Sequence, residues 1–233
     1  MSTSAVSSSP LASRPIGALD GTPVYLSAQT VPGLAGAVVA SYLAAWISRP
    51  RWTGSARLAL TAIWWLAIQG ADTLHTLGHI RSARQMGAPM DAIQLAWGVQ
   101  RNVYHKQTVT PRQHIGRASG GPLTSAVITS GALLSDSLVR RIPILSAISE
   151  AWLFTNAITL IGSLTPLPPL DGWSIVKWGV VQHTGDEAQG KVIADQAGRL
   201  TIGVAILGGV LWLIRGGLRK ILPPLPVNLK SGS

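Results

Sequence analysis

The sequence contains no cysteine and few charged side chains, and both shortages restrict what the protein can be. Without cysteine there is neither a disulfide nor a thiolate metal site, so histidine, aspartate and glutamate are the remaining candidate ligands. Charged residues make up 12% of the 233 residues, against roughly a quarter in a typical soluble domain. The mean hydropathy of +0.32 is correspondingly high. Lipid rather than water is therefore the expected surrounding of most of the chain.

The formal net charge of +10 would also suit a protein that binds nucleic acid, but the distribution of the charge does not. The basic residues stand between apolar runs, which is where a membrane protein keeps them. We therefore expect membrane lipids as partners of the chain, and no nucleic acid. The predicted localisation is integral and multi-pass, in the cell membrane of a prokaryote.

Five apolar runs have the length of a bilayer crossing or come close to it, which predicts four to five transmembrane helices. The runs cover residues 31–48, 58–80, 122–134, 142–164 and 200–214. Residues 1–25 are rich in serine, alanine and proline, and we predict a disordered tail there. Residues 26–222 are predicted as one membrane-embedded domain and residues 223–233 as a C-terminal tail. The two sides of the membrane would differ by a single basic residue, which does not orient the chain.

A polar, basic segment follows the second apolar run. Its stretches 93–100 and 102–110 have the β-branched and aromatic content of two short strands. They predict a small membrane-associated β-hairpin at about residues 91–110. The two histidines of this segment, His105 and His114, are expected to be in contact with water.

The second apolar run contains two histidines, His75 and His79, one helical turn apart. Side chains at positions i and i+4 project from the same face of a helix, so two imidazoles can share one zinc ion. Asp72 lies on that face as well. Ionisable groups are costly at membrane depth and usually have functional partners there. The location therefore favours a metal site, although histidines at this spacing also occur as packing or surface residues.

A candidate third ligand lies in the stretch GSLTPLPPLDGW, residues 162–173. Its three prolines stop a membrane helix, and an Asp-Gly pair with Asp171 comes shortly after them. Irregular backbone at membrane depth is tolerated only where it packs in protein or lines a cavity. We therefore expect Asp171 to face an interior polar site; the alternative is a helix-ending turn at the membrane surface.

Together these motifs resemble the site-2 protease family of intramembrane zinc metalloproteases. The family pattern is HExxH, an AGP-type turn before a later span, and a distant N-x-x-P-x-P-x-L-D-G. This chain has HTLGH, then GGPL at residues 120–123, then SLTPLPPLDG at residues 163–172, in the same order. The resemblance covers residues from about 58 to 178. It implies an all-α polytopic membrane protein with a site-2-protease-like core and a small membrane-associated β-hairpin.

The resemblance also implies a ligand set and a mode of client binding. Zinc would be held by His75, His79 and Asp171, and the hairpin would present an unfolded client segment as an added strand. Transmembrane proteins or peptides are the implied clients. The implied substrate-binding residues are Ser125, Ser163, Trp97 and Gly98, of which the two serines replace asparagines of the family.

The chain departs from the family at the catalytic position, where Thr76 replaces the glutamate that acts as general base. Threonine cannot accept a proton near neutral pH, and general acid–base catalysis is typically worth ~10²–10⁴-fold in rate. Asp72 is the alternative base, although its position favours a role as partner for a histidine N–H. Trp173 stands where the family commonly has a second glycine, and it is expected to fill space near the site.

Three functions are compatible with these residues. The first is an inactive or impaired protease homologue that keeps its zinc site and binds transmembrane clients or partners without cutting them. The second is an active intramembrane metalloprotease with Asp72 as an unusual base. The third is a membrane protein that binds or transports metal ions.

Overall fold

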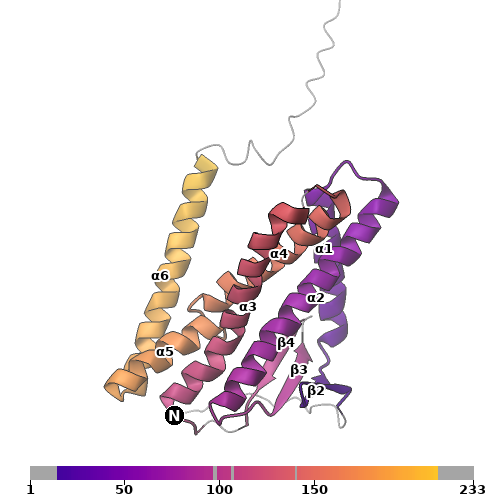
Figure 1. The fold of residues 1–233 in the computed structure, drawn as a ribbon. Coiled ribbons are helices and arrows are strands. Elements are labelled where there is room, and N and C mark those ends of the chain that lie inside the picture. Colours follow the sequence, from indigo (N-terminus) through magenta and orange to yellow (C-terminus); the bar gives the residue numbers. More distant parts are fainter. Residues whose placement is uncertain (1–14, 97–98, 106–107, 140, 215–233) are drawn as a thin grey trace, which may run out of the picture.

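Helices dominate the structure, and one small sheet accompanies them (Figure 1). The computed structural model describes residues 15–96, 99–105, 108–139 and 141–214, and six helices and four strands lie within these ranges. The helices are α1 (Thr30–Ser48), α2 (Gly54–Gln85), α3 (Pro111–Val139), α4 (Pro143–Leu164), α5 (Asp171–Thr184) and α6 (Glu187–Ile214). The strands are β1 (Gly17–Leu19), β2 (Thr22–Leu26), β3 (Ala92–Ala96) and β4 (Val99–Val103). The predicted helical membrane fold is confirmed.

Four of the described helices, α1, α3, α4 and α6, are long and apolar enough to cross a membrane, in agreement with the predicted four to five spans. They leave large apolar side chains exposed, such as Leu134 and Leu138 on α3, as a lipid-facing surface does. The helices α3 and α6 begin earlier than the apolar runs that predicted them, because residues 111–121 and 187–199 continue each helix.

The helix α2 is the centre of the bundle and contacts α1, α3 and α4. It is more polar than the four lipid-exposed helices, and many of its residues are buried. The side chains of Leu60 and Trp64 pack there against small residues of the neighbouring helices, among them Ala45 and Ala151. Because α2 is enclosed in this way, its polar residues His75, Thr76 and His79 are buried inside protein.

The sheet corrects the prediction of a disordered tail at residues 1–25. Within this sheet, β1 and β2 form an antiparallel hairpin. The two residues between these strands, Asp20 and Gly21, both have positive φ, as the type I′ turns of tight hairpins require. Arg84 of α2 forms an ion pair with Asp20 and fixes the hairpin to the helix. The Asp-Gly pair was the signal for this hairpin, whereas residues 1–14 lie outside the described residues, as does the predicted C-terminal tail.

The predicted second hairpin is present as β3 and β4, with shorter strands than the sequence suggested. The strands are separated at residues 97–98, and the chain enters α3 at Pro111 rather than continuing a strand to residue 110. Because β2 pairs in parallel with β3, the sheet has the order β1-β2-β3-β4. Ile93 is fully buried against Ile80 of α2, so the sheet packs on the same helix that carries the two histidines.

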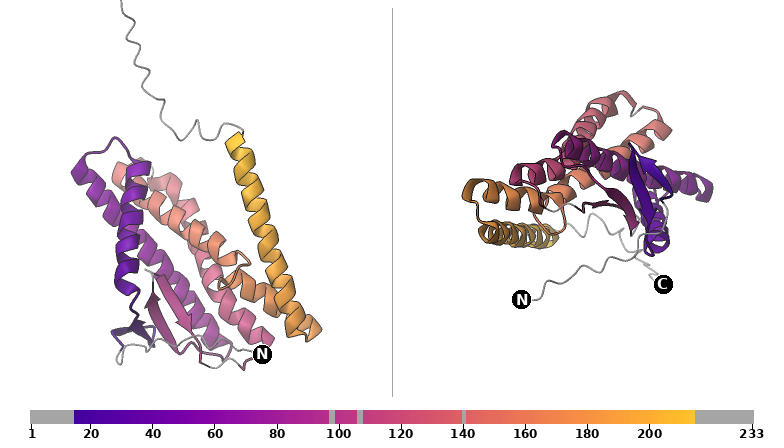
Figure 2. Two further views of the ribbon diagram at one scale, coloured as in Figure 1. Left: turned by 180° about the vertical axis from the view of Figure 1, so that it is seen from behind. Right: turned by 90° about the horizontal axis from the view of Figure 1, so that it is seen from below.

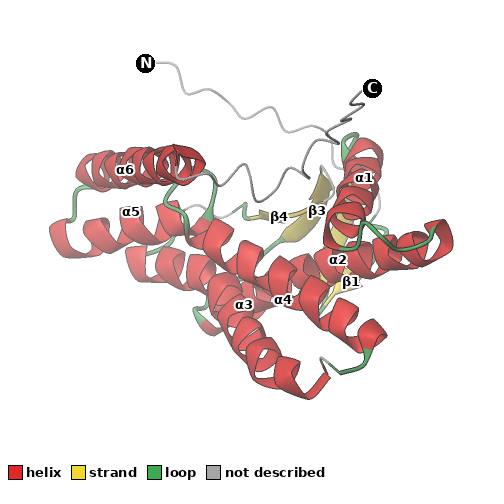
Figure 3. Cartoon of the chain, turned by 90° about the horizontal axis from the view of Figure 1, so that it is seen from above, coloured by secondary structure: helices red, strands yellow, loops and turns green. Residues whose placement is uncertain are grey.

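The helices α5 and α6 form the other flank of the molecule (Figures 2 and 3). The short helix α5 contacts α3 and α4, while α6 contacts α5 and stands apart from the upper part of the bundle (Figure 1). The ion pair between Lys177 and Glu187, 2.6 Å apart, joins the two helices. Asp171 is the first residue of α5 and therefore faces the bundle from this flank.

A contact between glycines brings α2 and α3 together. A methyl group added to Gly78 would overlap the carbonyl oxygen of Gly120, and one added to Gly120 would overlap that of Gly78. Small residues of this kind let membrane helices approach closely enough for backbone contact. The separation of α2 and α3 therefore depends on the absence of side chains at these two positions.

We predict that Gly120→Ala destabilises the protein, because the added methyl group forces α2 and α3 apart. Overpacking of a close contact costs roughly 1–3 kcal/mol. The change is measured as a lower midpoint of thermal unfolding in detergent. Gly131→Ala is the matched control on the same helix, since nothing lies near its added methyl group. Equal midpoints for both variants would show that the glycine contact does not set the packing.

Candidate metal centre

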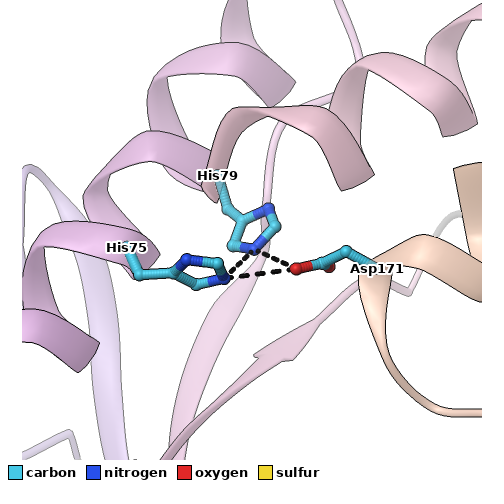
Figure 4. A group of neighbouring side chains, drawn as sticks. All are labelled: His75, His79 and Asp171. Carbon is cyan, nitrogen blue, oxygen red and sulfur yellow. Dashed lines mark hydrogen bonds and ion pairs between the residues drawn. The ribbon is translucent and has the colours of Figure 1, made fainter. Parts of the chain in front are cut away.

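His75, His79 and Asp171 converge on one point from two helices (Figure 4). The Nε2 atoms of the two histidines are 3.0 Å apart. The Asp171 Oδ2 atom lies 3.2 Å from Nε2 of His75 and 3.3 Å from Nε2 of His79. The histidines project from neighbouring turns of α2, and the carboxylate comes from the start of α5. The structure thus joins the three residues that the sequence analysis named as ligands.

The hydrogen bond of His79 determines its tautomer. The Nδ1 atom of His79 lies 2.7 Å from the carbonyl oxygen of Arg117 on α3. A carbonyl oxygen only accepts hydrogen bonds, so Nδ1 carries the proton and donates it. In the neutral ring, the lone pair of Nε2 then points towards His75 and Asp171. This is the tautomer that an Nε2 metal ligand needs.

The ring of His75 also has a hydrogen-bond partner on α3. Its Nδ1 atom lies 2.9 Å from the hydroxyl oxygen of Ser125, which is fully buried. Arg117 and Ser125 are eight residues apart on α3, so they lie on one face of it and each supports a different histidine. Ser125, predicted to bind substrate, lies behind the His75 ring in the structure.

The donor set fits a zinc ion by geometry and by charge. Zinc binds histidine nitrogen at about 2.0–2.1 Å with tetrahedral geometry, which separates neighbouring ligand atoms by roughly 3.3 Å. The three separations found here, 3.0, 3.2 and 3.3 Å, are close to that value. Lone pairs and a carboxylate crowded at this distance repel one another unless a cation or a ring proton lies between them.

Gly121 provides the space for both imidazole rings. A methyl group at this position would overlap Nε2 of His79 and Nε2 of His75. Gly121 lies midway between Arg117 and Ser125, on the same face of α3. One stripe of α3 therefore supports both rings and leaves room for their ligand atoms.

The position of the family's base holds a small, neutral side chain. Thr76 follows His75 on α2, is 1% exposed and lines the cavity beside the ligands. Its hydroxyl carries no charge and cannot act as a carboxylate does. The ligand geometry is thus present together with a residue that cannot take up a proton near neutral pH.

Asp72 occupies a different place from the one predicted for it. Its Oδ2 atom accepts a hydrogen bond of 2.8 Å from the backbone N–H of Gln100 in β4. The prediction that Asp72 supports a histidine N–H is wrong, because Arg117 and Ser125 hold the two Nδ1 positions. The acidic side chain faces the sheet because β4 crosses α2 one turn before the first ligand.

A cavity of about 720 Å³ surrounds the centre and extends between β4, α4 and α5. Ser163, predicted to bind substrate, lines it, although its hydroxyl donates to the carbonyl oxygen of Leu160 in its own helix. Trp97 and Gly98, also predicted to bind substrate, lie outside the described residues. Trp173 lines the cavity as well, and its indole N–H donates to Asp195 of α6 at 2.8 Å.

Sequence reasoning missed Arg117, which joins the sheet region to the metal centre. Its backbone carbonyl supports His79, its Nε donates to the carbonyl of Ala88, and its guanidinium lies over the ring of Tyr104 at 4.3 Å. Burial raises the pKa of Tyr104 above its ordinary value, and the charge of Arg117 offsets this only in part. Tyr104 therefore stays neutral. The sequence carried no signal for this role, because the burial of Arg117, at 5% exposure, comes from its tertiary contacts with Ala88 and Tyr104.

The wall of the cavity formed by α5 was also missed. His114, expected in water, stacks on Trp178 with ring centres 3.8 Å apart. The ammonium group of Lys177 lies 4.2 Å from the centre of the Trp178 ring. Because α3 and α5 meet here, polar and aromatic groups from the predicted loop become part of the site.

Comparisons with known proteins find relatives that are named as zinc metalloproteases. No family model matches the chain. Rip3 of Mycobacterium tuberculosis, named as a zinc metalloprotease, is 30% identical over 165 residues, which are 66% of this chain and 42% of that protein. The similarly named sll0528 of Synechocystis is 29% identical over 209 residues, 89% of this chain and 53% of that protein. The chain spans about half the length of the curated relatives it matches.

A solved structure has a similar fold. The Site-2 Protease from Methanocaldococcus jannaschii matches with a TM-score of 0.53 at 19% sequence identity, over 85% of both chains. This similarity concerns the fold, which places two histidines of α2 opposite the aspartate at the start of α5.

We predict that Ser125→Ala lowers zinc affinity by about 10–100-fold, as the loss of a hydrogen bond behind a metal-binding histidine typically does. The affinity is measured by competition with a chelator in detergent. Ser119→Ala is the control, because the hydroxyl of Ser119 donates only to Ile115 of its own helix. An unchanged zinc affinity in Ser125→Ala would show that the hydrogen bond between Ser125 and His75 does not contribute to metal binding.

Proposed function

Because the chain is a divergent member of the site-2 protease family, we propose that it is a multi-pass membrane protein with a zinc centre that binds clients and is impaired or inactive as a protease. The zinc ligands are His75, His79 and Asp171. The clients are transmembrane proteins or peptides with an extended segment, and the membrane is the cell membrane of a prokaryote.

The observation that carries the proposal is the contrast between the ligands and the base. The three ligand atoms converge and both histidines have their supporting hydrogen bonds. Beside them, Thr76 is buried and neutral. A zinc ion bound here would act as a Lewis acid and polarise a carbonyl oxygen. The proton transfers of peptide hydrolysis would still lack a general base at the position of Thr76.

The residues around the centre are suited to holding a client segment. The cavity is bounded by the strand β4, to which an extended segment can add as a further strand. Apolar and aromatic side chains, including Ile158 and Trp178, form the opposite walls. Such a site orients an extended backbone next to the metal ligands.

An active protease with Asp72 as base is the alternative of the same family. The hydrogen bond from Gln100 disfavours it, because one of the two carboxylate oxygens of Asp72 is already bonded to the backbone of β4. A metal-transport function remains the third candidate, and metal flux across proteoliposomes would support it.

We predict that the wild-type protein does not cleave a tagged model transmembrane substrate in proteoliposomes above the level of Asp171→Ala. Thr76→Glu restores a general base beside the cavity and is expected to raise the cleavage rate, by up to ~10²-fold. Cleavage is measured by gel and mass spectrometry, with a zinc chelator as reference.

Thr76→Gln is the matched control, since it has the size of the glutamate without its basicity. Cleavage by the wild type that disappears in Asp171→Ala would contradict the proposal of impaired proteolysis. Further loss of that cleavage in Asp72→Ala would assign the base to Asp72.

A further inference from the structure

The strand β4 is held against α2 by two hydrogen bonds of one residue. The backbone N–H of Gln100 donates to Oδ2 of Asp72 at 2.8 Å, and its side-chain Nε2 donates to Oγ1 of Thr73 at 2.8 Å. Two neighbouring residues of α2 thus accept hydrogen bonds from one strand residue, Asp72 from its main chain and Thr73 from its side chain. A helix carboxylate bonded to the main chain of a strand is a specific contact, separate from the metal ligands.

This contact lies on the open edge of the sheet. β4 is the last strand in the order β1-β2-β3-β4, and it pairs only with β3 among the described strands. Since the N–H of Gln100 points to α2, it points away from β3. Backbone groups alternate in direction along a strand, so Asn102 faces the same edge. The edge borders the cavity that contains the metal ligands.

The same edge carries acceptors that lack partners. Within the described residues, Oε1 of Gln100 and Oδ1 of Asn102 are buried and have no hydrogen-bond partner. Both side chains line the cavity. An extended segment in the cavity could donate its N–H groups to such oxygens. Its own carbonyl groups would need backbone N–H donors on this edge, and the one of Gln100 is already bonded to Asp72.

We propose that Asp72 is an intramolecular latch, which occupies the strand edge of β4 and competes with the client segment for the backbone N–H of Gln100. The inference rests on the proposed function, because it takes β4 as the client-binding edge. Hydrogen bonds to a carboxylate are roughly twice as strong as those to a neutral carbonyl. A client carbonyl that replaces Asp72 therefore exchanges a stronger bond for a weaker one, and the latch weakens client binding.

The test uses a fluorescent model client with the zinc-loaded full chain in detergent micelles. The probe is a synthetic peptide with a Leu/Ala transmembrane helix followed by a short extended Thr/Val segment, and its affinity is measured by fluorescence anisotropy. We expect Asp72→Ala to bind the probe about five- to tenfold more tightly than the wild type, from the difference between charged and neutral hydrogen bonds. Asp72→Asn keeps the shape and a neutral acceptor, and is expected to give a smaller gain.

Asp91→Ala is the matched control. Asp91 also accepts a hydrogen bond from a backbone N–H of this segment, that of His105 at 2.7 Å, but it is exposed and away from the edge. It is expected to bind the probe as the wild type does. Binding is located by a disulfide between a cysteine in the extended segment and Arg101→Cys on β4, which is a unique thiol in this cysteine-free chain.

The outcomes separate the latch from the function on which it rests. Tighter binding in both Asp72 variants, with the disulfide to β4 formed, supports the latch. Equal or weaker binding in them, with the disulfide formed, overturns the latch and leaves client binding in place. No binding to any variant, or binding without that disulfide, overturns client binding along β4 and the latch with it.

Discussion

The close approach of α2 and α3 is the constraint on which the rest of the structure depends. Gly78 and Gly120 allow backbone contact, and Gly121 leaves room for two imidazole rings. At this distance Arg117 and Ser125 reach the Nδ1 atoms of the histidines. A wider separation would leave the rings without support and move them relative to Asp171. The packing of two helices therefore determines the chemistry of the site.

The site joins a complete ligand set to an incomplete catalytic set. The same helix α2 supplies both ligating histidines, the threonine at the base position, and the aspartate that holds β4. The carboxylate of Asp171 belongs to the metal ligands and that of Asp72 to the strand edge, whereas Thr76, at the position of the base, is neutral. Arg117 connects the metal centre with the sheet region through Tyr104 and Ala88. Metal site and strand edge form one unit, which suits recognition of an extended segment.

The sequence predicted the features that depend on local pattern. Apolar runs identified the described helices except α5, and the motif order placed His75, His79 and Asp171 in one site. The contacts that form only in the tertiary structure could not be predicted from the sequence. The partner of Asp72 comes from a strand 28 residues away, and His114 reaches Trp178 only because α3 meets α5. The first hairpin carried a local signal, its Asp-Gly turn, but the polar composition around it outweighed that signal.

The most direct test of the account is the zinc content of the purified protein, measured by elemental analysis after detergent extraction and reloading. The account predicts about one zinc per chain in the wild type and in His183→Ala, an exposed histidine outside the site, and loss of zinc in His75→Ala. A wild-type protein without zinc after reloading, or a His75→Ala variant with the same zinc content as the wild type, would contradict the metal centre.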